Sequence, residues 1–114
     1  MSEAILPVKW MSVEIRYSPR AIRDLDEIYD YIANHLQNLT AAQKIIGGIL
    51  DAVENLSSFP ESGAKLIFSP GLDSGYCYVQ HKKYLAFYHL SGTDVYVDRV
   101  LYGKQDYENL IVQL

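Results

Sequence analysis

The spacing of apolar residues changes period along this chain, and the order of the periods limits the folds open to it. Residues Val13–Tyr17 alternate apolar and charged side chains, which is typical of a half-buried strand. Over Pro19–Gln37 the spacing becomes three and four residues, which indicates an amphipathic helix. A second helical stripe covers Ile45–Leu56 after a short break. We therefore expect a strand followed by an antiparallel helical hairpin.

Local signals mark where these helices begin. Ser18 stands directly before a proline and is well suited to cap the first helix. Thr40 and Gln43 have the spacing of a capping box and predict the start of the second helix. Arg20 and Asp24 lie four residues apart, and we expect them to pair on the outer face of the first helix.

The second half of the chain reads as strands. Three runs rich in β-branched and aromatic residues, Gly75–Gln80, Tyr84–Leu90 and Asp94–Leu101, are separated by connections short enough for hairpins. Residues Lys65–Ser74 carry no clear pattern, and Gln105–Leu114 suggests a short final helix. The expected fold is α+β: an N-terminal strand and a helical hairpin packed on an antiparallel sheet of about four strands, with a short C-terminal helix or tail.

Length and composition narrow the class of protein. A chain of 114 residues with 49% hydrophobic side chains suits one domain, which we place at 13–114 with 1–12 as an extension. No apolar run reaches the length of a membrane span, and the start lacks the pattern of a secretion signal. The single Cys77 favours a reducing, cytoplasmic setting, and a net charge of −4 argues against a general polyanion binder.

No strong catalytic or cofactor motif is present, so we expect neither a metal nor a cofactor. Cys77 is better explained as a small buried hydrophobe than as a nucleophile, and His89 as a structural histidine with its polar atoms satisfied. The pair Gly47-Gly48 lies inside the second helix, where glycine is costly. Either another element approaches the backbone closely there, or a partner lies against it.

One compact group combines basic and aromatic side chains. Lys82 and Lys83 form a predicted hairpin turn between His81 and Tyr84. Lysines at such a turn commonly do no more than keep it solvated, but the same group could also contact a partner. Ten tyrosines, most of them in the sheet half, suit either a half-buried sheet or a recognition surface.

Four segments in order resemble one protein family. The sequences EIRYSPRAIRDLDEIYDYIA, LSSFPESG, YLAFYHL and DRVLYGKQDYENLI are similar to the RelE/ParE superfamily of toxins from type II toxin–antitoxin modules, over about Val13–Ile111. The resemblance implies a toxin that inhibits growth and belongs to a plasmid-stabilisation system. It also implies a hetero-oligomer in which a cognate antitoxin wraps over the sheet and helices of the toxin. The residues expected to contact the antitoxin are Gly47, Gly48, Tyr78 and Tyr88.

Members of the superfamily divide by side chains rather than by fold. RelE-like toxins cut messenger RNA on the ribosome, which requires proton transfer and cations that hold the phosphate charge. Where those proteins carry an arginine this chain has Leu85, and where they carry lysines it has Tyr76 and Tyr78. A ribonuclease site would have to be rebuilt from His81, Lys82, Lys83, Lys104 and Tyr107.

The segment DLDEIYDYIA resembles ParE proteins more closely, and these are associated with inhibition of DNA gyrase. This resemblance favours a toxin that binds gyrase through a surface including Arg99–Leu114. The expected target contacts are Lys82, Lys83, Tyr84, Arg99, Lys104 and Tyr107. Two alternatives stay open: a ribosome-dependent endoribonuclease, or an inactive member that only binds antitoxin.

Overall fold

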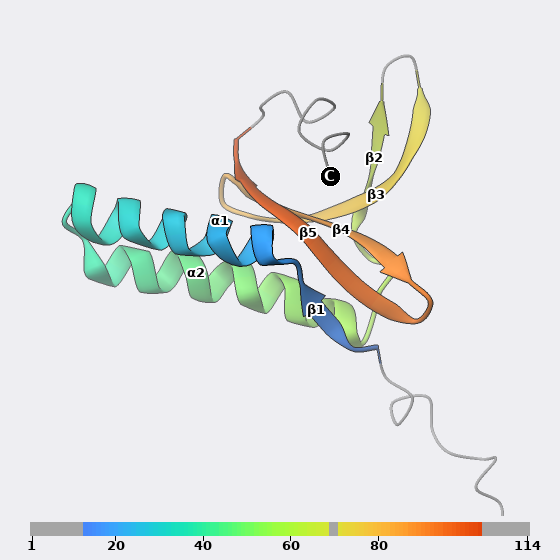
Figure 1. The fold of residues 1–114 in the computed structure, drawn as a ribbon, viewed down its shortest axis with the longest axis horizontal. Helices are drawn as coiled ribbons and strands as arrows, with labels where there is room; N and C mark the ends of the chain where they lie inside the picture. The colour runs from blue at the N-terminus through green and yellow to red at the C-terminus, as the bar shows by residue number, and fades with distance from the viewer. Residues whose placement is uncertain (1–12, 69–70, 104–114) are drawn as a thin grey trace, which may run out of the picture.

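A computed structural model describes residues 13–68 and 71–103 of the chain. Figure 1 shows two helices side by side against a twisted sheet. In chain order the elements are β1 (Ile15–Tyr17), α1 (Pro19–Asp30), a π-helical turn (Tyr31–His35), α2 (Leu39–Glu54), a 3-10 turn (Asn55–Ser57), β2 (Ala64–Phe68), β3 (Leu72–His81), β4 (Tyr84–Ser91) and β5 (Asp94–Tyr102). The predicted α+β architecture, with a helical hairpin between the first strand and a meander, is confirmed.

The sheet contains five strands in the order β1-β5-β4-β3-β2, and it differs from the expected sheet in two details. First, β2 lies where the sequence predicted no element, because among residues 64–67 only Leu66 is buried and no alternation results. Second, β1 pairs with β5 in parallel, with Ile15 opposite Val95. The long helical connection between β1 and the meander imposes no hairpin and therefore permits this direction.

A bulge in β5 positions the first helix. Phe87 of β4 lies opposite Arg99 and Tyr88 lies opposite Val97, so Asp98 is the extra residue. At this point β1 ends, and Ser18 donates its backbone N–H to the Val97 carbonyl at 2.9 Å and its hydroxyl to the Asp98 carbonyl at 2.8 Å. α1 thus starts directly on the bulge of β5.

The helix starts agree only in part with prediction. The Ser18 hydroxyl accepts the Ala21 N–H at 2.9 Å, which confirms it as the cap of α1. The capping box at Thr40 was wrong: Asn38 caps α2, and its side-chain oxygen accepts the Ala41 N–H at 3.0 Å. Asn38 follows Gln37, whose φ of 52° reverses the chain between the helices, so α2 begins two residues earlier than the sequence pattern indicated.

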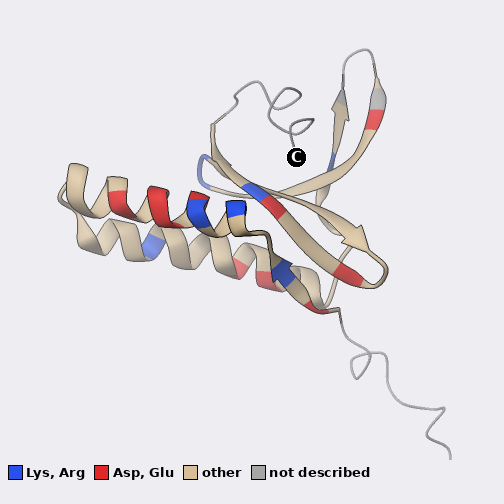
Figure 2. Ribbon diagram, in the orientation of Figure 1, with Lys and Arg blue, Asp and Glu red and all other residues tan. Residues whose placement is uncertain are grey.

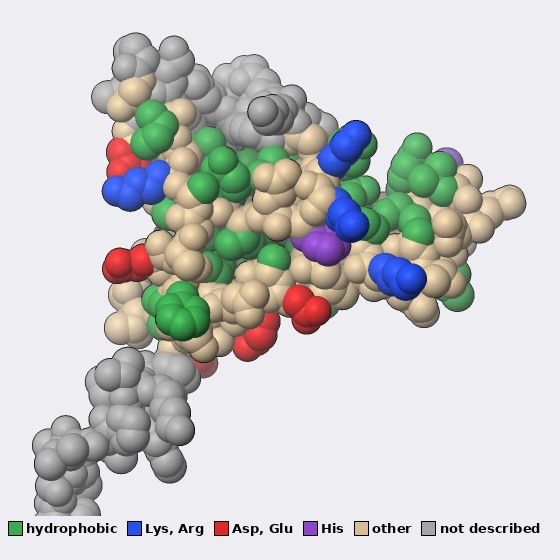
Figure 3. Space-filling view, turned by 180° about the vertical axis from the view of Figure 1, so that it is seen from behind, with side chains coloured by type: hydrophobic (Ala, Val, Ile, Leu, Met, Phe, Trp, Pro, Cys, Tyr) green, Lys and Arg blue, Asp and Glu red, His purple; other side chains and the backbone are tan. Residues whose placement is uncertain are grey.

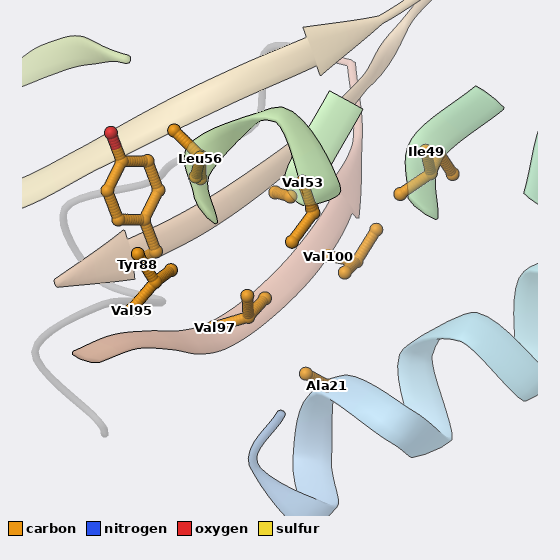
Figure 4. Close-up of a cluster of buried hydrophobic side chains, with 9 residues drawn as sticks. Ala21, Ile49, Val53, Leu56, Tyr88, Val95, Val97 and Val100 are labelled. Carbon is orange, nitrogen blue, oxygen red and sulfur yellow. The ribbon is translucent and has the colours of Figure 1, made fainter. Parts of the chain in front are cut away.

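Both faces of β4 are buried by apolar side chains. Figure 4 shows the helix side, where Ala21 of α1 and three residues of α2 and the following turn meet β4 and β5. The buried members of this cluster are Ala21, Ile49, Val53, Leu56, Ala86, Tyr88, Val95, Val97 and Val100. A second cluster, Leu66, Leu85, Phe87 and Leu101, lies on the opposite face of the sheet. We call that opposite face the open sheet face.

Two predictions fall outside the described residues: the extension at 1–12 and the short final helix at Gln105–Leu114. None of the helices in the described residues is both long enough and apolar enough to span a bilayer.

Candidate functional site

A groove opens between the helices and one end of the sheet. α1 and the π-helical turn form one wall, and the start of β4 with the end of β5 forms the other. The groove has a volume of about 620 Å³. Its lining residues are Asp24, Glu27, Ile28, Tyr31, Leu36, Tyr84, Arg99, Val100, Leu101 and Tyr102. π-helical turns occur frequently at functional sites, and here one forms the wall of this groove.

A buried ion pair closes the inner end of the groove. The Asp24 carboxylate accepts two hydrogen bonds from the Arg99 guanidinium, from Nε at 2.8 Å and from Nη2 at 3.1 Å. It also accepts the Val100 backbone N–H at 2.9 Å. This N–H lies on the edge of β5 beyond the end of β1, so Asp24 satisfies a backbone donor that no strand pairs. The Asp24 side chain is 7% exposed and the Arg99 side chain is 9% exposed. The charge of Arg99 is therefore neutralised by Asp24 rather than by solvent.

The expected pairing of Asp24 with Arg20 on the outer face of α1 was wrong. Asp24 follows the buried Ala21 by three residues and precedes Ile28 by four, so it lies within the apolar stripe of the helix. An acidic residue inside such a stripe is the signal that could have indicated a buried partner. The partner itself, 75 residues away in the sequence, could not be read from local spacing.

Tyrosines form the outer part of the groove. The rings of Tyr84 and Tyr102 meet edge to face, with centroids 5.0 Å apart. The pKa of Tyr84 is raised above its ordinary value. Burial is the largest cause, and the neighbouring Tyr102 and Tyr31 raise it further. Tyr31, Leu36 and Tyr102 are each at least half exposed, which leaves a large apolar surface at the mouth of the groove.

Aromatic side chains also cross the open sheet face. His89 of β4 lies between Tyr76 of β3 and Tyr96 of β5, with ring centroids 5.6 and 5.3 Å away. His89 Nδ1 lies 2.6 Å from a carboxylate oxygen of Asp98, the bulge residue, so the histidine has the polar partner that the sequence predicted it to have. Burial raises the pKa of Asp98, and His89 opposes that rise. Burial and the Asp98 charge raise the pKa of Tyr76.

On this face, the positions at which RelE-like toxins carry arginine or lysine hold uncharged residues in this chain. Leu85 is buried, and Tyr78 packs its ring on Phe87 with centroids 5.8 Å apart. Arg99 is the only lysine or arginine within β3, β4 and β5, and it is the residue that Asp24 neutralises.

The remaining candidates for a ribonuclease site lie elsewhere. Lys82 and Lys83 are exposed at the turn between β3 and β4, with His81 at the end of β3. Figure 2 shows this basic turn apart from the acidic residues along α1. Lys104 and Tyr107 lie outside the described residues. Of the five residues expected to form a nuclease site, the structure therefore places three together.

The residues expected to contact an antitoxin do not form one surface. Tyr88 is 1% exposed, and its hydroxyl donates to the Pro60 carbonyl and accepts the Gly63 N–H, both at 3.1 Å. It is a core residue and offers no surface to a partner. The His81 imidazole packs directly against Gly48, so at Gly48 the reason for glycine is a close approach of the sheet. A Cβ at Gly47 would meet nothing within 4 Å, so that position is open.

Metal and thiol chemistry receive no support from the described part of the chain. Within it, no group of three or more His, Cys, Asp or Glu residues is arranged to hold a metal ion. Cys77 is a partly buried free thiol packed against the helix-side cluster, as expected of a small hydrophobe.

Comparison with known proteins indicates a family. Residues 15–107 match the model of the family described as "ParE toxin of type II toxin-antitoxin system, parDE". Among solved structures, the chain is similar to the "Chromosomal ParDE TA system from P. aeruginosa", with a TM-score of 0.66 and 21% identity, over 81% of this chain and 97% of that one. It is also similar to the toxin–antitoxin complex RelBE2 from Mycobacterium tuberculosis, with a TM-score of 0.58 and 19% identity, over 80% of this chain and 98% of that one. No curated protein matches. At these identities the solved structures establish a shared fold.

Proposed function

Because this chain belongs to the ParE toxin family of type II toxin–antitoxin systems, we propose that it inhibits DNA gyrase by binding it and is neutralised by a cognate antitoxin. The proposal treats the chain as a binding protein that catalyses no reaction. The antitoxin partner is supported by the solved structures of similar fold, which are a ParDE system and a RelBE2 complex.

The single observation that carries this proposal is the state of Arg99. Cleavage of RNA by its own 2′-hydroxyl builds negative charge on the phosphate, and a free cation must stabilise that charge. The one arginine or lysine within β3, β4 and β5 already donates two hydrogen bonds to Asp24 and is buried. Leu85, Tyr76 and Tyr78 supply no replacement charge. The open sheet face of the described residues is therefore suited to binding a partner and poorly suited to breaking a phosphodiester.

The groove supplies the surface for a protein target. Large aromatic side chains with a polar tip contribute strongly to protein interfaces, and Tyr84 and Tyr102 are arranged edge to face at the groove mouth. Tyr31 on the opposite wall is 53% exposed and Tyr102 is 50% exposed, so both are available to a partner. We assign gyrase contacts to Tyr84 and its neighbours in the groove, and antitoxin contacts to Tyr78 on the open sheet face and to the backbone at Gly47.

The direct test adds the purified protein to gyrase and relaxed plasmid and measures supercoiling. We expect inhibition at stoichiometric toxin, and we expect Tyr102→Ala to raise the concentration for half inhibition by about tenfold, as for an interface hot spot. Phe59→Ala is the matched control, because Phe59 is 69% exposed and lies outside the groove. Unchanged supercoiling at a large excess of toxin would remove the proposal.

A ribosome-dependent endoribonuclease is the second candidate function, and the observation that favours it is the pair of exposed lysines, Lys82 and Lys83, next to the half-buried His81. It predicts fragments of message in a translation mixture, abolished by combining Lys82→Ala with Lys83→Ala. Intact message together with inhibited supercoiling would select the gyrase proposal. Activity in neither assay, with a complex formed on co-expression with the antitoxin, would identify an inactive member.

A further inference from the structure

Three lysines and a histidine gather where the turn between β3 and β4 meets α2. We call this group the basic tip; its members are Lys44, His81, Lys82 and Lys83. None of the three ammonium groups forms an ion pair within the described residues, whereas Arg16, Lys65 and Arg99 all do. Figure 3 shows basic side chains gathered beside a histidine on this side of the molecule. The chain as a whole is acidic, so the positive charge here is local.

The backbone of the turn adopts a conformation that lysine does not favour. Lys82 has a φ of 56°, in the left-handed region that side chains other than glycine and asparagine rarely enter. The next hairpin has the same two-residue length and carries Gly92, with a φ of 64°, at the corresponding first position of its turn. In one turn the left-handed conformation is adopted by glycine, which tolerates it. In the other it is adopted by Lys82, whose backbone is therefore strained. The side chain of Lys82, rather than the turn geometry, explains that choice.

Hydrogen bonds hold the turn in place. The Gln80 side-chain amide donates to the Lys82 carbonyl at 2.8 Å. The Gly103 backbone N–H donates to the Lys83 carbonyl at 2.6 Å. With both carbonyls fixed, the two ammonium groups extend from a pre-organised backbone, which lowers the entropic cost of binding a partner.

Contact with α2 adds the third lysine. The His81 imidazole packs against Gly48, where any side chain would collide with it. Lys44 precedes Gly48 by four residues and therefore lies on the same face of the helix, one turn away. Gly48 consequently lets the end of β3 pack on α2 one helical turn away from Lys44, so basic residues of two separate elements lie on the same side of the molecule.

We propose that the basic tip binds the backbone phosphates of duplex DNA, so that the toxin contacts the DNA as well as the protein of its target. The proposal rests on gyrase as that target, since gyrase supplies duplex DNA beside the bound toxin. Exposed lysines on a turn suit an extended polyanion better than a small anion, which proteins usually enclose in a concave pocket. DNA presents one negative charge per about 1.7 Å of its axis, a far higher density than an acidic peptide segment offers.

The test is a titration of the full chain with a 20-base-pair duplex. Amide NMR monitors the binding at 50 and at 200 mM salt. We expect shifts confined to the residues around positions 44–48 and 80–84. Three phosphate contacts predict that the affinity falls roughly 40-fold between the two salt concentrations. Lys82→Gly removes one charge and also the backbone strain at this position. The loss of affinity between the two salt concentrations should then be only roughly 12-fold, while the thermal midpoint stays equal or rises. Lys83→Gln and Lys44→Gln should each reduce the salt dependence in the same way.

Lys65→Gln is the matched control, because it removes an equal charge from β2, where Lys65 already pairs with Asp73 at 3.8 Å. It should leave the salt dependence unchanged. Polyglutamate of equal total charge should bind at least tenfold more weakly than the duplex. The proposal would be overturned if polyglutamate bound as tightly as the duplex or more tightly. It would also be overturned if the basic-tip variants had the same salt dependence as the wild type. These readouts need no gyrase, so toxin that binds DNA through the tip yet leaves supercoiling unaffected would refute the gyrase target alone.

Discussion

Replacing Asp24 with asparagine should be among the most damaging single changes to this fold. The substitution removes the charge that neutralises Arg99 and leaves a guanidinium whose side chain is 9% exposed without a counter-ion. Breaking a buried pair in this way costs about 3–5 kcal/mol, because the remaining charge stays desolvated. Asparagine keeps one oxygen that can accept from the Val100 N–H, so we expect the lower end, about 3 kcal/mol. For a domain of this size that free energy lowers the thermal midpoint by about 12 °C.

The assay is urea unfolding of the wild type, Asp24→Asn, Arg99→Met and the double variant Asp24→Asn with Arg99→Met, in which asparagine still offers an oxygen to the Val100 N–H. The double variant removes both charges together, so it should unfold within about 1 kcal/mol of the wild type. Asp26→Asn is the control, since it removes the same charge from an exposed position on the same helix. The reasoning fails if Asp24→Asn costs no more than Asp26→Asn, or if the double variant is as unstable as the worse single variant.

Three further predictions concern the helices and the pH dependence. Ser18→Ala removes both the cap of α1 and the hydroxyl that donates to β5, and should lower the free energy of unfolding by about 1–2 kcal/mol in urea titrations. Gly47→Ala should stabilise the protein by up to about 1 kcal/mol, whereas Gly48→Ala should gain less or lose stability because it displaces His81; equal effects would contradict the packing described. Burial raises the pKa of Tyr17 to about 12, so its contribution is complete below pH 10 and is lost as the pH rises toward 12. The wild type should therefore lose stability more steeply than Tyr17→Phe across that interval in thermal scans.

The sequence predicted those parts of the fold that depend on local periodicity. The alternation at Val13–Tyr17, the helical stripes and the three strand-like runs all correspond to observed elements, because each pattern reports which side chains of one segment face the core. β2 was not predicted, since Leu66 is the one buried side chain among residues 64–67 and this stretch shows no alternation. The cap at Asn38 was missed because Thr40 and Gln43 offered a competing motif two residues later.

The candidate site was less predictable because its defining contacts join distant segments. Tyr84 and Arg99 were both named as target contacts, and the structure places both in the groove. The role of Arg99, however, depends on Asp24, and that pairing follows only from the way α1 crosses the edge of β5 beyond the bulge. Tyr88 was expected to contact the antitoxin, but it lies on the face of β4 that the helices cover, and periodicity does not reveal which face of a strand the helices cover.

The Asp24–Arg99 pair also links the stability of the fold to the kind of chemistry the sheet can perform. An arginine that must neutralise a buried carboxylate, and thereby fix α1 to the unpaired edge of β5, is not free to bind a transition-state phosphate. Releasing it would leave the carboxylate unpaired at a cost of several kcal/mol, a large fraction of the stability of a small domain. The free positive charge of the described residues is instead placed on the solvent side of α1 and at the basic tip, where it requires no desolvation. The position of one acidic residue within a helix stripe therefore removes Arg99 from the charges that could stabilise a phosphate on this sheet.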